Sequence, residues 1–274
     1  MNDQILVPGI GVLPVNAFVV HAAEPVVVDT GLSLPGRRFM DTLGSVVDPT
    51  DVRWIWLTHT PIEITPEPCS TVLDAAPHAR LVTTFLSAGI LSTQQPVPLH
   101  RLHLLNPGQS LDVGDRTLTA FRPPLYDSPA TVGFYDDRSQ TCFSSDCFGA
   151  PMPSAELARC SDVAMVPADQ LRSGQLLWAT VDSPWVHTTD AAGYLRTIEP
   201  IRAMDPTTIL STHLPPAIGR TSQFLEMLTA APQADPFIGP DQQALEAMLA
   251  SLDPATADAS SADAPIRVSS DVIS

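Results

Sequence analysis

The most constraining feature of the 274-residue sequence is a short, almost uninterrupted apolar run that leads directly into a histidine. The run is Trp-Ile-Trp-Leu at residues 54–57, and Thr58 and His59 follow it. Apolar residues without alternation are typical of a strand that is covered on both faces, as in the parallel sheets of α/β proteins. A second apolar strand, at residues 207–211, leads in the same way to His213. The sequence therefore predicts an α/β protein with two buried strands that each end near a histidine.

The other predicted elements alternate in an order that fits two sheets between outer helices. Period-two patterns and turn residues predict the other strands at residues 5–7, 16–20, 25–28, 80–83, 102–105, 109–113, 117–121, 131–135 and 141–144. Helical spacing predicts helices at residues 34–47, 69–76, 85–91, 190–203, 222–229 and 241–252. The expected fold is a four-layer αββα sandwich, formed by one domain over residues 1–252. Residues 253–274 have little to bury and are expected to form a disordered acidic tail.

The strong negative charge of the chain narrows its expected partners. The formal net charge is −16 and the sequence pI is about 4.5, which disfavours binding to nucleic-acid phosphates or to anionic membranes. No apolar run is long enough for a membrane helix, and no basic segment typical of a signal peptide begins the sequence. We therefore expect a cytoplasmic protein that binds a small-molecule substrate or ligand. Its oligomeric state, including a homodimer, stays open.

Polar residues that could carry chemistry follow several of the predicted strands. His59 ends the apolar run described above, and Glu63 lies four residues further on. Asp127 precedes one strand, Asp146 follows another, and His213 follows the last. Imidazole and carboxylate groups at the edge of a sheet suit a metal ion with hard oxygen ligands, such as Fe, Mn or Zn.

Five short segments, in this order along residues 5–220, resemble the metallo-β-lactamase superfamily. They are Val-Asp-Thr-Gly at 28–31, Leu-Thr-His at 57–59, Ser-Pro-Ala-Thr at 128–131, Ser-Ser-Asp-Cys-Phe-Gly at 144–149 and Thr-His at 212–213. Two of these segments, Ser-Pro-Ala-Thr and Ser-Ser-Asp-Cys-Phe-Gly, are most similar to the branch of flavodiiron-like, oxygen-binding diiron proteins. The resemblance implies the αββα fold and a site for two metal ions.

The resemblance also implies that this site is degenerate in its first loop. Members of the superfamily carry the motif H-x-[H/E/D]-x-D-H, whose first histidine matches His59. Pro61 stands at the second ligand position and has no donor atom. Glu63 replaces the aspartate, and Ile64 replaces the last histidine.

The later positions of the motif are better retained. Asp127 stands where most members have a histidine, and it keeps oxygen atoms that can bind a metal ion. Asp146 matches the aspartate that bridges the two ions, and His213 matches the final histidine. Asp29 matches an early aspartate that supports the site in the superfamily without binding metal.

Three functions follow from this reading of the sequence. The first is a metal-dependent hydrolase with one ion, in which Asp146 and Glu63 assist a metal-bound water that attacks a small ester or amide. The second is a non-catalytic protein, without metal, that binds or senses a ligand in the same cleft. The third is a non-haem iron protein that senses oxygen or redox state.

Overall fold

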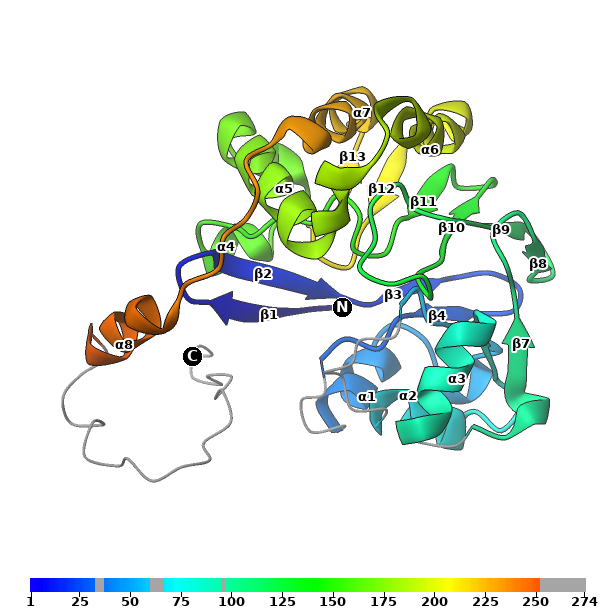
Figure 1. Ribbon diagram of the computed structural model, residues 1–274. Coiled ribbons are helices and arrows are strands. Elements are labelled where there is room, and N and C mark those ends of the chain that lie inside the picture. Colours follow the sequence, from blue (N-terminus) through cyan, green and yellow to red (C-terminus); the bar gives the residue numbers. More distant parts are fainter. Residues whose placement is uncertain (33–36, 60–66, 95–96, 252–274) are drawn as a thin grey trace. The chain divides into compact units, whose positions relative to one another are not determined.

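The computed structural model describes residues 1–32, 37–59, 67–94 and 97–251 (Figure 1). The chain divides into two compact units, Met1–Asp235 and Pro236–Ser274. In the second unit, the described residues include one helix, α8 (Gln242–Ser251). The domain over residues 1–252 and its disordered tail stay predictions, because residues 252–274 lie outside the described part of the chain.

The strands of the first unit form three sheets. β1 (Asn2–Val7) and β2 (Gly11–Asn16) form an antiparallel hairpin. A five-stranded sheet has the order β3 (Phe18–Val20), β4 (Val26–Val28), β5 (Trp54–Trp56), β6 (Arg80–Thr83) and β7 (Leu102–Leu104). A six-stranded sheet has the order β13 (Ala217–Ile218), β12 (Thr208–Leu210), β11 (Thr141–Phe143), β10 (Gly133–Asp136), β9 (Thr117–Phe121) and β8 (Ser110–Asp112).

The α-helices of this unit fall into two groups along the chain. The first group comprises α1 (Arg37–Gly44), α2 (Glu67–Ala75) and α3 (Phe85–Gln94). The second group comprises α4 (Ala155–Ala158), α5 (Ala168–Asp182), α6 (Ala191–Met204) and α7 (Thr221–Ala230). Short 3-10 helices lie at Pro49–Asp51, Leu99–Arg101, Val163–Met165, Pro184–Thr188 and Ala231–Gln233.

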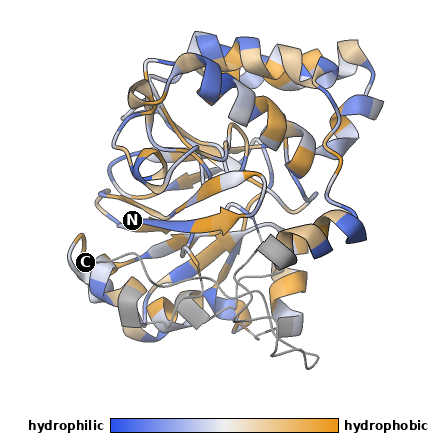
Figure 2. Ribbon diagram, turned by 90° about the vertical axis from the view of Figure 1, so that its left-hand side faces the viewer, coloured by the Kyte–Doolittle hydropathy of each residue, from blue (hydrophilic) through white to orange (hydrophobic). Residues whose placement is uncertain are grey.

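Three hydrophobic clusters show how these elements are layered. Because side chains alternate along a strand, Val26 and Val28 of β4 point to one face of their sheet and Val27 points to the other. Val26 and Val28 pack with Phe134 of the six-stranded sheet, so the two sheets face each other. Val27 packs instead with the first group of helices, and a third cluster joins the second group to the six-stranded sheet. Figure 2 shows hydrophobic residues concentrated along the strands between the helices.

The predicted αββα sandwich is therefore confirmed. Several elements differ from their predicted bounds by one to three residues, such as α1, which ends at Gly44 and not at residue 47, and one predicted strand is wrong. Residues 16–20 are not a single strand, because β2 ends at Asn16 and β3 begins at Phe18. The sequence did not predict β2 because Pro14 lies within it. Proline lacks a backbone N–H donor and is tolerated at the edge of a sheet; β1 is the one strand that pairs with β2 in its sheet, and on its other side β2 makes an isolated bridge between Val12 and Met152.

The topology brings four loops to the carboxyl ends of parallel strands. β4 and β5 are parallel neighbours in one sheet, and the loops that follow them begin with Asp29 and with Leu57–His59. β11 and β12 are parallel neighbours in the other sheet, and Asp146 and His213 follow them. Carboxyl ends of neighbouring parallel strands are common positions for ligand sites. Among the described residues, no helix is both long and apolar enough to cross a membrane.

Candidate metal site

Three of the predicted site residues converge on one carboxylate oxygen. Oδ1 of Asp146 lies 3.2 Å from Nε2 of His213 and 3.7 Å from Nε2 of His59. Asp146 and His59 are buried, with 3% and 6% of their surface exposed. Oδ1 of Asp146 has no hydrogen-bond partner among the described residues. Burying a carboxylate oxygen without a hydrogen bond costs free energy, so the position of this oxygen needs a physical explanation.

The ring of His213 is fixed by the β1–β2 hairpin. Nδ1 of His213 lies 2.7 Å from the carbonyl oxygen of Pro14. A carbonyl oxygen only accepts, so Nδ1 of His213 carries the proton and donates it. In the neutral ring, Nε2 then presents a lone pair toward Asp146. Such a bond to a backbone carbonyl is the usual support of a metal-binding histidine.

A chain of hydrogen bonds from Asp29 fixes the ring of His59. Asp29 accepts hydrogen bonds from the backbone N–H and from the hydroxyl of Thr58, both at 2.8 Å. Oγ1 of Thr58 also lies 3.1 Å from Nδ1 of His59. The hydroxyl of Thr58 has one proton, for which Asp29 competes with Oγ of Ser145 at 3.0 Å. With this proton on the charged carboxylate, the Thr58 oxygen faces His59 as an acceptor. In the neutral ring, Nδ1 of His59 then carries the proton and Nε2 presents a lone pair toward Asp146.

Unusual backbone conformations hold the loops in place. Asp29, Ser145 and Phe148 have φ angles of 54°, 53° and 72°, in the left-handed region that residues other than glycine rarely adopt. Two hydrogen bonds hold the loop at Ser145. Its carbonyl oxygen accepts from the backbone N–H of Thr212 and from the hydroxyl of Ser211, both at 2.9 Å. Strained residues cluster at functional sites because the surrounding structure enforces them.

Gly149 makes room for an aromatic side chain against the site. A Cβ atom at this position would lie 2.6 Å from Cδ1 and Nε1 of Trp178 and 2.9 Å from Cβ of His213. The indole of Trp178 lies edge-on to the His213 ring, with 5.0 Å between the ring centroids. Its Nε1 donates a hydrogen bond of 3.2 Å to the carbonyl oxygen of Asp146. Any larger residue at Gly149 therefore displaces a wall of the site.

The pKa values of the two histidines shift in opposite directions, although the nearby carboxylates raise both. Burial lowers the pKa of His59, but the carboxylates of Asp146, Asp29, Asp127 and Asp182 raise it further, so its pKa lies above the ordinary value. The pKa of His213 lies below its ordinary value, since burial outweighs the attraction of Asp146. The site as a whole combines two imidazoles with an excess of carboxylates, which favours a bound cation.

Asp182 is a carboxylate near the site that the sequence analysis missed. It ends α5, and burial together with the charges of Asp146 and Asp127 raises its pKa to about 8. Asp182 and Asp146 line the same narrow gap. No motif marks Asp182 in the sequence, because its nearness to Asp146 depends on how α5 packs.

The structure says less about the other two predicted ligands, Asp127 and Glu63. Asp127 lies in the loop before β10, exposed, and its Oδ1 accepts a hydrogen bond of 3.0 Å from Thr131. Glu63, together with the replaced positions Pro61 and Ile64, lies outside the described residues. Its role as a ligand and the degenerate loop motif therefore stay predictions, as does the role of Asp127.

The residues at the centre of the site fit one metal ion in part. Two ligands of a tetrahedral ion lie roughly 3.4 Å apart when their bonds are about 2.1 Å long, and the two histidine–aspartate distances lie close to this value. Both Nε2 atoms are free to bind, and the Asp146 oxygen has no other partner. Among the described residues, however, no group of three or more His, Cys, Asp or Glu is arranged to hold an ion by itself, so additional donors are needed.

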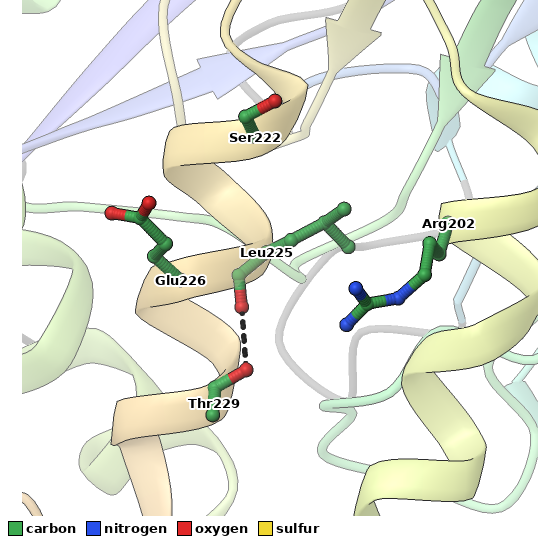
Figure 3. A pocket seen from close by; sticks show the side chains of 5 residues that line it. All are labelled: Arg202, Ser222, Leu225, Glu226 and Thr229. Atoms are coloured by element: carbon green, nitrogen blue, oxygen red, sulfur yellow. Dashed lines mark hydrogen bonds between the residues drawn. The ribbon is translucent and has the colours of Figure 1, made fainter.

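A second hollow lies away from these residues, between α6 and α7. It has a volume of about 370 Å³ and is lined by Arg202, Ser222, Leu225, Glu226 and Thr229 (Figure 3). Nε of Arg202 lies 3.3 Å from a carboxylate oxygen of Glu199, one turn earlier on α6, and both side chains are more than half exposed. These are features of a solvated helix surface.

Comparison with known proteins supports the fold. No family model matches the chain. Over 139 residues it is 28% identical to putative diflavin flavoprotein A 1 of Thermosynechococcus vestitus, which covers 49% of this chain but 24% of that protein. The chain thus spans about a quarter of the length of this curated relative.

Two solved structures are similar to most of the chain. Rubredoxin oxygen:oxidoreductase from Desulfovibrio gigas superposes with a TM-score of 0.72 at 15% identity, over 85% of this chain and 57% of that one. The flavodiiron protein from Giardia intestinalis gives a TM-score of 0.66 at 14% identity, over 81% of this chain and 52% of that one.

Proposed function

Because this chain has the metallo-β-lactamase-like fold of the flavodiiron proteins, we propose that it binds one divalent metal ion, with iron as the first candidate. The ion lies between His59, Asp146 and His213 and serves oxygen or redox sensing. The observation that carries the proposal is the buried Oδ1 of Asp146, which lacks a hydrogen bond and faces both histidine rings.

The donor set favours iron over other ions. Two histidines and one carboxylate, with further positions open, are the ligands of mononuclear non-haem iron(II) sites that react with oxygen. When bound, iron would supply one-electron chemistry and a position for oxygen. Two solved structures of the same fold are named as an oxygen:oxidoreductase and as a flavodiiron protein, which agrees with iron as the candidate.

The chain's own residues have defined tasks in this proposal. The carbonyl oxygen of Pro14 and the hydroxyl of Thr58 hold the two imidazoles with their Nε2 atoms free. Asp29 fixes the orientation of Thr58, and Trp178 covers one side of His213. A narrow gap lies beside Asp146, lined in part by Phe148 and Trp178.

Iron titration without oxygen tests the proposal. Ferrous iron is added to metal-free protein, and bound iron per chain is measured after removal of the excess. We expect about one equivalent, and a visible absorbance that changes when oxygen is admitted. His213→Ala should lose this binding, whereas His78→Ala, which alters an exposed histidine far from the motif, should keep it.

Less than about a tenth of an equivalent of iron, manganese or zinc in the wild-type protein would refute the proposal, because a folded metal site binds its ion tightly. Iron binding without any response to oxygen would leave a metal site but refute oxygen sensing. Hydrolysis stays a prediction, because it requires a water molecule activated by the ion. Zinc-loaded protein and a small ester substrate test that activity.

A further inference from the structure

Arg122 directly follows β9, and two aromatic rings hold its side chain. The guanidinium carbon of Arg122 lies 5.2 Å from the centre of the Tyr126 ring. The ring of Trp185 packs against that of Tyr126, with 4.8 Å between the centroids, and Nε1 of Trp185 donates a hydrogen bond of 2.8 Å to the carbonyl oxygen of Tyr126. Because an arginine side chain stacks favourably on an aromatic face, these contacts fix the position of the guanidinium group.

The two aromatic residues belong to segments that border the candidate metal site. Leu125, which precedes Tyr126, lines the narrow gap next to Asp146. Asp182 lines the same gap and lies three positions before Trp185. Both segments that support the guanidinium group are therefore part of the surroundings of the site.

Arg122 also binds the loop that contacts the segment of His59. Its Nη1 donates a hydrogen bond to the carbonyl oxygen of Thr131. The backbone N–H of the next residue, Val132, donates a hydrogen bond of 2.6 Å to the carbonyl oxygen of Thr58. Thr58 precedes His59, so this short chain of contacts leads from the guanidinium group to one of the two histidines.

The protein itself uses the positive charge of Arg122 only in part. None of the ion pairs among the described residues includes Arg122, although Asp127 lies on the same loop. A guanidinium group has five N–H donors, and the described hydrogen bond of Arg122 is the one to Thr131. Partial burial also lowers the pKa of Arg122. A partly buried charge without an opposite charge nearby costs free energy, and an anionic ligand would offset this cost.

We propose that Arg122, held by the ring of Tyr126, binds the oxyanion group of a small-molecule ligand beside the candidate metal site. The fork of a guanidinium group matches two oxygen atoms of a carboxylate or of a phosphate, so both groups have the required chemistry. Because the chain has a net charge of −16, anions are repelled at long range, and their binding should depend strongly on this one cation. The inference goes beyond the function proposed above and requires no bound metal ion.

The test adds inorganic phosphate or acetate to the full chain, free of metal and isotope-labelled for magnetic resonance. The Nε–H resonance of Arg122 reports the contact in the wild type, and the backbone amide resonances of Tyr126 and Thr131 report binding in every variant. We expect these resonances to shift and to saturate with at least one of the two anions. Tighter binding of phosphate identifies a phosphate group as the natural partner, and tighter binding of acetate identifies a carboxylate.

Substitutions of Arg122 give the second readout. We expect Arg122→Gln to weaken binding of the preferred anion at least tenfold. Arg122→Lys, which keeps the charge but not the fork of donors, should recover part of this loss. The matched control is Arg172→Gln, which removes an exposed arginine of α5 and should leave the affinity within about twofold of the wild type.

Three results would overturn this proposal. The first is that neither anion binds the wild type below about 0.1 M, where the Debye length is still about 10 Å. The second is that Arg122→Gln, shown by thermal unfolding to be folded, binds both anions like the wild type. The third needs no variant: the anions shift other resonances of the wild type but not the Nε–H of Arg122. Because the protein is free of metal, failure here leaves the iron proposal intact, and failure of the iron titration leaves this one intact.

Discussion

Gly149→Ala provides the sharpest test of how closely the site is packed. The new Cβ atom would lie 2.6 Å from two atoms of the Trp178 indole and 2.9 Å from Cβ of His213. Carbon atoms in contact prefer about 3.5–4.0 Å, so the indole has to retreat by about 1 Å. Gly149 is not among the residues with positive φ. The backbone therefore accepts alanine, and the whole cost arises from packing.

The expected loss of stability follows from these contacts. Overpacking in a filled core costs about 1–3 kcal/mol. The retreat of Trp178 also breaks its hydrogen bond to the carbonyl oxygen of Asp146, which contributes about 1 kcal/mol. We expect the free energy of unfolding to fall by about 2–4 kcal/mol. For a unit of this size, that corresponds to a decrease in Tm of roughly 5–15 °C.

Urea unfolding, followed by tryptophan fluorescence and by circular dichroism, measures the change. The matched control is Gly89→Ala in α3, where an added Cβ would meet nothing within 4 Å. Because alanine favours a helix more than glycine does, this control should gain up to about 1 kcal/mol. The two substitutions are thus expected to have opposite signs. A free energy of unfolding for Gly149→Ala within about 0.5 kcal/mol of the wild type would refute the packing argument.

Two further predictions concern the supports of the fold and the site. Thr58→Val leaves the buried Asp29 without a hydroxyl donor and should lower the free energy of unfolding by about 1–3 kcal/mol. Thr58→Ser, which keeps the hydroxyl, should recover most of this loss in urea unfolding. Away from the site, the hydrogen bond from the Arg116 side chain lowers the pKa of Asp115 to about 2. Since the folded pKa is depressed, Asp115 stabilises the protein above its ordinary pKa near 4 and loses this effect as the pH falls through about 2. The stability difference between wild type and Asp115→Asn should thus be constant above pH 5 and vanish at low pH. A difference that persists unchanged at pH 2 contradicts this linkage.

Much of the fold was predictable because its determinants are local. The apolar run before His59 predicts β5, and the turn residues around residues 117–121 predict β9 with the bounds that the structure has. His59, Asp146 and His213 were predictable as partners because each follows a strand, and carboxyl ends of parallel strands meet at one edge. The order of these strands and residues in the chain therefore indicated which side chains lie close together.

The supporting groups were not predictable, because they depend on packing between distant segments. Asp182 ends a helix 36 positions after Asp146, and only the angle at which α5 packs brings it to the site. The carbonyl oxygen of Pro14 orients His213, yet every residue has a carbonyl group, so no sequence pattern can single this one out. The hairpin that presents it was itself obscured by the proline.

That hairpin also affects the order in which the site can form. The contact between Pro14 and His213 spans 199 positions, and Asn16 donates hydrogen bonds to the carbonyl oxygens of Ser211 and Leu214 across 195 and 198 positions. Contacts this distant close a large loop and lose chain entropy before they gain any energy. The last histidine is therefore oriented only when nearly the whole first unit has folded. Metal uptake should consequently be a late event in folding, and its rate should report on the completed fold.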